Sequence, residues 1–244
     1  MLSKNQIKYI KDLSRKQVRT QERKFVVEGE KLIAELLSNG VFVDELYALE
    51  HWAEKHQSLN VTIISEKELS RISQLKTPNK VLAVVPMFDD QLEMETCAGL
   101  TLFLDRINDP GNLGTIIRMA DWFGIGQIVC SENSVDVYNA KVIQSSMGSV
   151  FRIPVYYREG VSFLKEYAEI HPEHPIVGAA MSGTTLNEYP VPQNGILVMG
   201  SESHGIHQDI EKCLQDTITI PRFGEAESLN VAMATGIILW EWKR

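Results

Sequence analysis

The alternation of short apolar runs with helical patterns between residues 100 and 242 constrains the fold of this chain more than any other feature. Apolar strands that alternate with helices form a mostly parallel sheet covered on both faces, so the sequence predicts an α/β fold. Ligands of such sheets bind at the carboxyl ends of the strands. The predicted strands are 101–104, 127–130, 153–157, 176–180, 195–200 and 217–220, and the predicted helices are 113–123, 139–147, 161–170, 208–213 and 231–240.

A smaller α/β unit precedes this one. Residues 1–88 alternate in the same way, over a length that is ordinary for an independent domain. Residues 89–99 are acidic and lack a clear period, which predicts a linker. The expected domains are therefore 1–88 and 100–244. Within the first unit, helices are predicted at 5–18, 30–38, 51–57 and 66–72, and strands at 24–29, 44–49, 61–65 and 81–86.

The charge of the chain is unevenly distributed. The net charge is −8, but residues 1–31 contain nine lysines and arginines against four acidic residues, so this segment carries +5 and the rest −13. A basic segment on an acidic body favours a partner that carries phosphates and contacts one end of the protein. A solvated helix face is the alternative interpretation of the same run of charge.

Composition disfavours several classes of protein. With 44% apolar and 23% charged residues the chain resembles an ordinary globular protein, and no apolar run approaches the roughly 20 residues of a membrane span. The N-terminus is polar and basic, unlike a signal peptide. The three cysteines, Cys97, Cys130 and Cys213, stand apart, and no histidine pair has further partners that would complete a metal cluster. We therefore expect a reducing, cytoplasmic location and no metal site.

Three loops that follow predicted strands contain candidate functional residues. The last of them connects strand 217–220 to the apolar helix 231–240 and places Ser228 and Asn230 at the start of that helix. Polar groups at a strand–helix junction, where backbone NH groups are free, suit a ligand site. Helix capping by Ser228 is the alternative.

The first loop, residues 105–112, leads into helix 113–123. Asn112 stands at the expected N-cap position, and Arg118 lies six residues later on a largely apolar helix. An arginine buried there needs a counter-charge or a phosphate, whereas a surface arginine needs neither.

The second loop, residues 200–205, follows a strand and has a glycine at each end, which lets the backbone approach a ligand closely. The loop lacks the GxGxxG pattern of dinucleotide sites, and the carboxylate of Glu202 would repel a bound pyrophosphate.

Together the three loops resemble, in order and spacing, the three motifs of the SpoU (TrmH-like) branch of the SPOUT RNA methyltransferases. The resemblance covers residues 100–244, and residues 1–88 resemble the L30e-like RNA-binding domain that often precedes them. Two positions depart from the family pattern, since Arg222 stands where Met is usual and Ala232 where Ser is frequent. The matching motifs are Asn112-x-Gly114-x-x-x-Arg118-x-Ala120, Gly200-x-Glu202-x-x-Gly205 and Ile220-Pro221-x-x-Gly224-x-x-x-Ser228-Leu229-Asn230-Val231.

The resemblance implies an enzyme that transfers the methyl group of S-adenosylmethionine to a ribose 2′-hydroxyl of ribosomal or transfer RNA, with ribosomal RNA slightly favoured. It also implies a C-terminal trefoil knot, a homodimer with the site near the interface, and no metal. It assigns catalysis to Asn112, Arg118, Glu202, Ser228 and Asn230. The cofactor is expected at Met181, Met199, Gly200, Ile220 and Leu229, and the RNA at Lys4, Lys8, Arg15, Lys16, Arg19 and Arg23.

The role of Arg118 and the function as a whole each leave alternatives open. A guanidinium stays protonated in proteins, so we expect Arg118 to clamp phosphate and activate the hydroxyl electrostatically, with the proton acceptor left open. One alternative is a non-catalytic RNA-binding or ribosome-assembly protein with the same fold, whose motifs would be expected to decay. Another is a nucleotide-using metabolic enzyme, which would need a phosphate loop where Asp105 and Asp109 stand.

Overall fold

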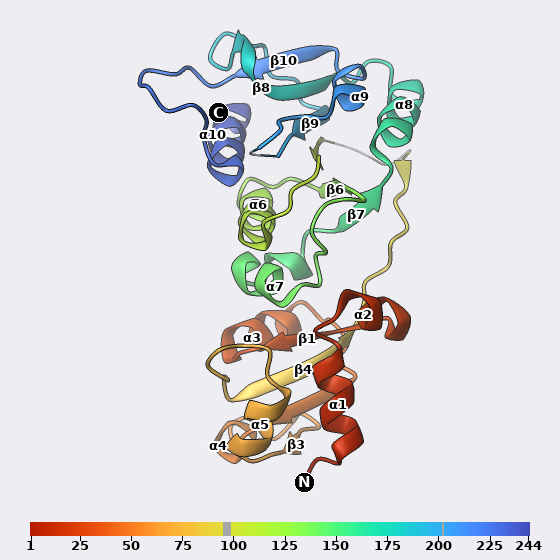
Figure 1. Ribbon diagram of the computed structural model, residues 1–244, viewed down its shortest axis with the longest axis vertical. Coiled ribbons are helices and arrows are strands. Elements are labelled where there is room, and N and C mark those ends of the chain that lie inside the picture. The colour runs from red at the N-terminus through yellow and green to blue at the C-terminus, as the bar shows by residue number, and fades with distance from the viewer. Residues whose placement is uncertain (95–98, 202) are drawn as a thin grey trace.

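The computed structural model describes residues 1–94, 99–201 and 203–244, which form two units stacked along the long axis of the molecule (Figure 1). Each unit is built around its own β-sheet. Among the residues described, no helix is long and apolar enough to cross a membrane. Residues 95–98, which include Cys97 and part of the predicted linker 89–99, lie outside the described residues. Glu202 lies outside them as well.

The second unit contains a six-stranded sheet in which every pairing is parallel. This confirms the predicted α/β fold with a mostly parallel sheet. The strand order does not test the trefoil knot, which stays a prediction. Across the sheet the strands are β10 (Asp216–Thr219), β8 (Ile176–Thr185), β9 (Gly195–Met199), β5 (Leu100–Leu104), β6 (Gln127–Ser131) and β7 (Val155–Arg158).

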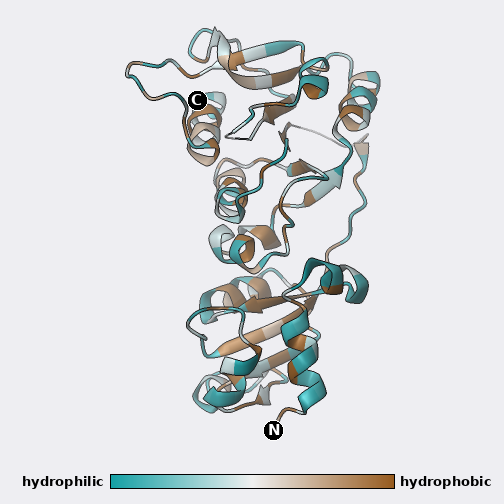
Figure 2. Cartoon of the chain, in the orientation of Figure 1, coloured by the Kyte–Doolittle hydropathy of each residue, from teal (hydrophilic) through white to brown (hydrophobic). Residues whose placement is uncertain are grey.

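Side chains of this sheet alternate between two cores, as the period of a strand requires. In β5, Leu102 and Leu104 join the core under one set of helices, whereas Phe103 joins the core on the opposite face. Figure 2 shows apolar residues on the strands and a mixture of apolar and hydrophilic residues on most helices, whereas α10 is apolar over most of its length. The first face is covered by α6 (Pro110–Trp122), α7 (Ala140–Ser146) and α10 (Val231–Lys243), and the other by α8 (Gly160–Ile170) and α9 (Gln208–Glu211).

The first unit contains a four-stranded, mixed sheet. Its strands lie in the order β1 (Lys24–Glu28), β4 (Val81–Pro86), β2 (Glu45–Ala48) and β3 (Thr62–Ile63), with only β2 and β3 parallel. α1 (Lys4–Asp12) and α5 (Glu66–Ile72) pack on one face, and α3 (Glu30–Ser38) on the other, with the short α4 (Glu50–Ala53) beyond β2. Ser65 caps α5 in a capping box with Glu68.

The predicted helix 5–18 is two helices, which corrects the sequence-based expectation. α1 ends at Asp12, and α2 (Lys16–Glu22) starts after a turn. The turn leaves the carbonyl oxygens of Leu13 and Ser14 available, and both accept hydrogen bonds from Nη1 of Arg19, at 3.0 and 2.7 Å. A continuous helix would have used these carbonyls for its own backbone bonds.

Candidate functional site

A cavity of about 710 Å³ lies where β9 and β10 end and β8 passes beside them. The five residues predicted to bind the cofactor, Met181, Met199, Gly200, Ile220 and Leu229, all line it. They come from three loops and strand ends that are distant in sequence, and the parallel sheet brings them together. The cavity is therefore the place at which their role as cofactor ligands can be tested.

Sequence reasoning missed much of the cavity wall. The additional lining residues either flank a motif or lie one or two helical turns after it, and their apolar character alone does not distinguish them from core residues. Proximity to the motif glycines at the strand ends is the one signal that could have found some of them. They include Ala179, Ser201, His204, Ile218, Val231 and Ile238.

Gly200 is the position at which the cavity depends on a close backbone crossing. A Cβ atom added to Gly200 would lie 2.2 Å from the carbonyl carbon of Gly205 and 2.4 Å from the amide nitrogen of Ile206. Ser201 and Gly205 pair in a single bridge through two backbone hydrogen bonds of 3.1 and 2.9 Å. Only glycine leaves room for this crossing, which shapes the loop over the end of β9.

A buried carboxylate fixes the same region from the side of β5. Asp105 is 3% exposed, and its Oδ2 accepts hydrogen bonds from the amide of His207 at 2.8 Å and from Nε of Arg106 at 3.2 Å. Its own amide donates to the carbonyl of Met199 at 2.9 Å. Asp105 thus ties the ends of β5 and β9 to the loop after the cavity, a role that the sequence did not predict.

Two of the predicted catalytic residues contact each other. Nδ2 of Asn230 donates a hydrogen bond of 3.0 Å to Oδ1 of Asn112, which joins the first turn of α6 to the start of α10. Oδ1 of Asn230 accepts from the amides of Ala232 and Met233, so Asn230 is the N-cap of α10. The alternative in which Ser228 caps this helix is therefore wrong, and Ser228 instead lines the cavity.

The expected N-cap at Asn112 is also corrected. Asp109 caps α6, its Oδ1 accepts from the amide of Asn112 at 2.9 Å, and Pro110 occupies the first helical position, where its missing NH costs nothing. This hydrogen bond to the amide of Asn112 is the main cause that lowers the pKa of Asp109. Asn112 consequently lies within the helix, with its side chain directed to α10.

The structure does not bring all the predicted catalytic residues to the cavity. Arg118 is exposed on α6 and is absent from the cavity lining, which matches the surface alternative within a single chain. Asn112 and Asn230 are absent from the lining, although Asn230 is bonded to Asn112 and lies two residues after Ser228, which lines the cavity. Glu202 lies outside the described residues.

Five of the six residues predicted to bind RNA are exposed on or beside α1 and α2, namely Lys4, Lys8, Arg15, Lys16 and Arg23. Arg19 departs from that prediction. It is 3% exposed, and its guanidinium is committed to protein partners, so it is removed from the set that can contact RNA. Within the described ranges, no group of three or more His, Cys, Asp or Glu is placed to hold a metal.

Comparison with known proteins places these features in a family. The model of the SpoU rRNA methylase family matches residues 99–240, more than half of the chain. The chain belongs to this family. The model of an MRM3-like substrate-binding domain matches residues 4–83.

Relatives of this SpoU protein extend over both units. The 23S rRNA (guanosine(2553)-2′-O)-methyltransferase RlmP of Bacillus subtilis is 31% identical, and the match covers 98% of this chain and 96% of RlmP. A solved TrmH-family protein of Porphyromonas gingivalis is 37% identical with a TM-score of 0.91, covering 99% of this chain and 98% of that one. The SpoU methyltransferase AviRb of Streptomyces viridochromogenes, solved with the cofactor AdoMet, is 25% identical with a TM-score of 0.89, covering 99% and 97%.

The cavity of the SpoU protein suits S-adenosylmethionine (AdoMet), the cofactor of the family. Its volume is in the range of small-molecule sites, roughly 300–1,000 Å³. Exposed apolar side chains such as Met181 and Leu229 offer a surface for an adenine ring. Ser201 adds a buried hydroxyl that has no hydrogen-bond partner among the described residues, and such a group is stabilised by a ligand that pairs with it.

We expect Gly200→Ala to weaken binding of S-adenosylhomocysteine, the demethylated cofactor, by about tenfold or more, because the added methyl group forces the backbone crossing apart. Gly224→Ala is the matched control, since a Cβ atom at Gly224, also on the cavity wall, meets no atom within 4 Å. Isothermal titration calorimetry measures both affinities. Equal affinities in the two variants would contradict the assignment of the crossing to the cofactor site.

Proposed function

We propose that this protein methylates a ribose 2′-hydroxyl of large-subunit ribosomal RNA. As a SpoU family member it is an S-adenosylmethionine-dependent RNA 2′-O-methyltransferase. The observation that carries the proposal is one cavity at the strand ends whose wall combines Gly200, Ile220, Ser228 and Leu229 from two separate motifs. The B. subtilis relative, named a 23S rRNA methyltransferase and similar over nearly the whole chain, supports the ribosomal target.

The chain's own residues contribute positioning more than covalent chemistry. S-adenosylmethionine supplies a methyl group on a sulfonium, which an oxygen nucleophile attacks in line, so the ribose hydroxyl must be aimed accurately. The hydrogen bond between Asn112 and Asn230 fixes the starts of α6 and α10 relative to each other. We propose that this pair and the hydroxyl of Ser228 orient the ribose at the edge of the cavity.

Arg118 is proposed as a phosphate clamp and electrostatic activator. A guanidinium presents a planar set of donors that matches a phosphate, and its positive charge favours loss of the hydroxyl proton as the new C–O bond forms. It lies on the exposed side of α6, six residues after Asn112. In the single chain its guanidinium is accessible to an RNA phosphate.

We propose that the protein forms a homodimer whose interface contains the exposed apolar side chains of α6 and α10. Trp122 on α6 is 84% exposed, and Met233 and Trp240 on α10 are each 63% exposed. Met233, Ile237 and Trp240 follow one another at helical spacing, so they form one face, and the two helices are packed together. A second copy of the chain is the occupant that the family resemblance implies, and Arg118, one turn before Trp122, would enter the same interface.

Three further expectations from the sequence stay proposals. We propose a substrate-binding domain over residues 1–88 and a catalytic domain over 100–244, joined by 89–99, in line with the two sheets and the two matched family models. The exposed lysines and arginines of α1 and α2 are proposed to contact RNA phosphates. A cytoplasmic location is proposed from the isolated cysteines, of which Cys130 and Cys213 are free thiols.

The reaction itself is tested by methyl transfer from labelled S-adenosylmethionine to total RNA from cells that lack the protein. The labelled RNA is digested and the nucleoside identified. We expect a 2′-O-methyl nucleoside at one position of large-subunit ribosomal RNA. A labelled base would move the acceptor off the ribose, and label in transfer RNA alone would overturn the ribosomal target. No label, with cofactor binding intact, would favour the non-catalytic RNA-binding alternative.

Arg118→Ala should lower the methylation rate about 100-fold or more, because removing one group that stabilises developing charge has an effect of this size. Binding of S-adenosylhomocysteine should change little, since Arg118 is not part of the cavity wall. Lys165→Ala, an exposed cation on α8 across the sheet, is the control and should retain the wild-type rate. Full activity of the Arg118 variant would disprove the assigned role.

Trp240→Glu should convert the dimer to a monomer, because it removes a large apolar side chain from the interface and introduces a carboxylate that must lose its hydration when the interface forms. We expect light scattering after size-exclusion chromatography to report half the mass, together with loss of methylation. Ile170→Glu places the same charge on α8, on the far face of the sheet, and should remain a dimer. A wild-type protein that is monomeric at micromolar concentration would contradict the proposed interface.

A further inference from the structure

Arg19, removed above from the RNA contacts, forms an ion pair between the two units. Its Nε lies 3.1 Å from Oδ2 of Asp136, and one terminal nitrogen donates to the same oxygen. The other terminal nitrogen donates to the carbonyls of Leu13 and Ser14. The side chain of Asp136 is 12% exposed, and its Oδ1 accepts from the amide of Tyr138. Both members of the pair are thus held by their own unit as well as by each other.

Other polar contacts cross between the units beside this pair. Nε2 of Gln144, on α7, donates to the carbonyl of Glu28 at 2.8 Å. Arg152 contacts Glu35 of α3 at 2.5 Å and Asp121 of α6 at 2.7 Å, so one guanidinium joins elements of both units. These contacts lie on several elements of each unit, which restrains rotation as well as separation.

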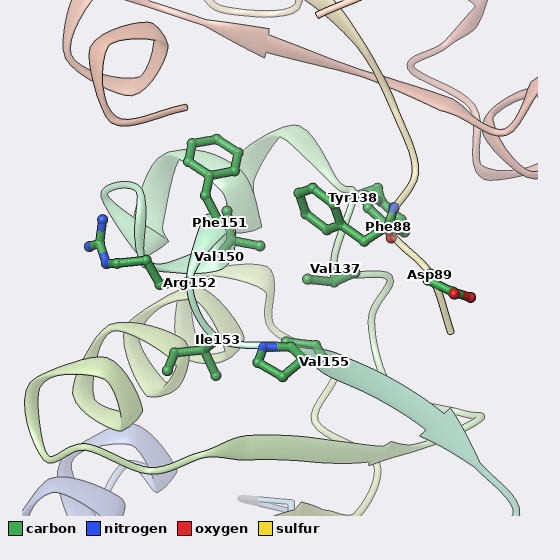
Figure 3. A pocket seen from close by; sticks show the side chains of 10 residues that line it. Phe88, Asp89, Val137, Tyr138, Val150, Phe151, Arg152, Ile153 and Val155 are labelled. Atoms are coloured by element: carbon green, nitrogen blue, oxygen red, sulfur yellow. Dashed lines mark hydrogen bonds between the residues drawn. The ribbon is translucent and has the colours of Figure 1, made fainter. Parts of the chain in front are cut away.

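Aromatic side chains of both units meet near these contacts, and Phe88, Tyr138 and Phe151 line a small pocket there (Figure 3). The ring of Tyr138 lies 4.7 Å from that of Phe25 and 6.0 Å from that of Phe88, and Phe88 also contacts Phe151 at 6.4 Å. The amide of Phe88 donates to the Tyr138 hydroxyl at 3.0 Å, and burial raises the pKa of Tyr138 to about 12. A cavity of only about 170 Å³ remains, and one hydrophobic core runs through both units.

The residues of this joint lead directly to the helix that carries Asn112 and Arg118. Next to Asp136, the amide of Val135 donates to the carbonyl of Ile107 at 2.8 Å, in the loop that precedes α6. α7 packs closely on α6, since a Cβ atom added to Gly114 would lie 2.5 Å from that of Ser145. The joint and the helix that carries Asn112 and Arg118 are therefore linked by direct packing, which fixes the first unit at one distance from the site.

We propose that this joint holds the basic helices α1 and α2 in one orientation relative to the methylation site, and that Arg19 is the positioning residue that sets the orientation. The proposal rests on the proposed function, because it takes the substrate to be an RNA long enough to contact both units. α1 lies in one half of the molecule and the cofactor cavity in the other (Figure 1). When an RNA binds at both places, the fixed distance between them determines which of its nucleotides reaches the methylation site.

An ion pair suits this role for a physical reason. Apolar packing favours contact between the units but tolerates small rotations, whereas the planar fork of an arginine bonds only in a narrow range of angles. A buried ion pair is weak evidence for stability, because the cost of removing two charges from water offsets their attraction. Fixing one arrangement against near alternatives is the better-attested use of such a pair.

The test compares two RNA substrates with the full-length protein. One is the long ribosomal RNA fragment that contains the methylated position, and the other is a short hairpin around that position, too small to reach α1. For Arg19→Lys and Asp136→Asn, we expect kcat/KM on the long RNA to fall about tenfold, in line with the sensitivity of rates to small misplacements. On the short hairpin, kcat/KM should stay within about twofold of wild type, since the site itself is unchanged.

Controls separate positioning from loss of structure. Asp209→Asn removes an exposed ion pair with Lys212 that lies within one unit, and should leave both substrates unaffected. Binding of S-adenosylhomocysteine and the thermal midpoint report whether each variant is folded. If the buried variants fail to fold, Gln144→Ala decides the question, because it removes a contact across the joint without leaving a buried charge.

Two outcomes would overturn the inference. Folded variants that methylate the long RNA as well as wild type would show that the joint does not position the substrate. An equal loss on the long RNA and on the hairpin would show a general structural role instead. If the wild-type protein methylates neither RNA, the proposed function itself fails, and that result precedes any comparison of variants.

Discussion

The close crossing of the backbone at Gly200 is the constraint on which the site depends. The carboxyl end of β9 meets residues 205 and 206 at a distance that excludes any side chain at position 200. The residue that follows this crossing, His207, is held by the buried carboxylate of Asp105, which accepts a hydrogen bond from its amide. Because this crossing fixes one wall, the strand ends of β8 and β10 and the segment around Leu229 need only close the other sides of the cavity. The sheet positions the loops at its carboxyl edge, and the backbone crossing at Gly200 shapes a cavity between them.

The sequence predicts the structural role of a residue where local chemistry produces a recognisable pattern along the chain. Strands and helices of the second unit followed from alternating hydrophobicity, since the two faces of a parallel sheet are both buried. The five residues predicted to bind the cofactor came from the family resemblance, and all five line one cavity, where their role as ligands stays a prediction. The N-cap of α6 did not follow, because Asp109 and Asn112 are both good capping residues and only the position of Pro110 favours the first.

Arg19 illustrates what composition cannot predict. Within a segment of nine lysines and arginines, nothing local distinguishes it from Arg15 or Arg23. Its burial depends on Asp136, which is 117 residues away, and on two carbonyls that become available only because the first helix breaks after Asp12. The same long-range packing joins the two units through one hydrophobic core. Ion pairs between residues so far apart in the sequence form only in the tertiary structure, and a single sequence carries no signal for them.

Arg118 connects the proposed chemistry to the proposed interface. An exposed guanidinium acts weakly on a distant charge, because water and salt screen it. The same group becomes a strong electrostatic partner when its surroundings are dry. Trp122, one helical turn from Arg118, and Trp240 on the neighbouring α10 are large apolar surfaces that exclude water once they are covered. We therefore infer that covering this face, by a second copy of the chain with the RNA beside it, both buries the tryptophans and gives Arg118 its catalytic strength.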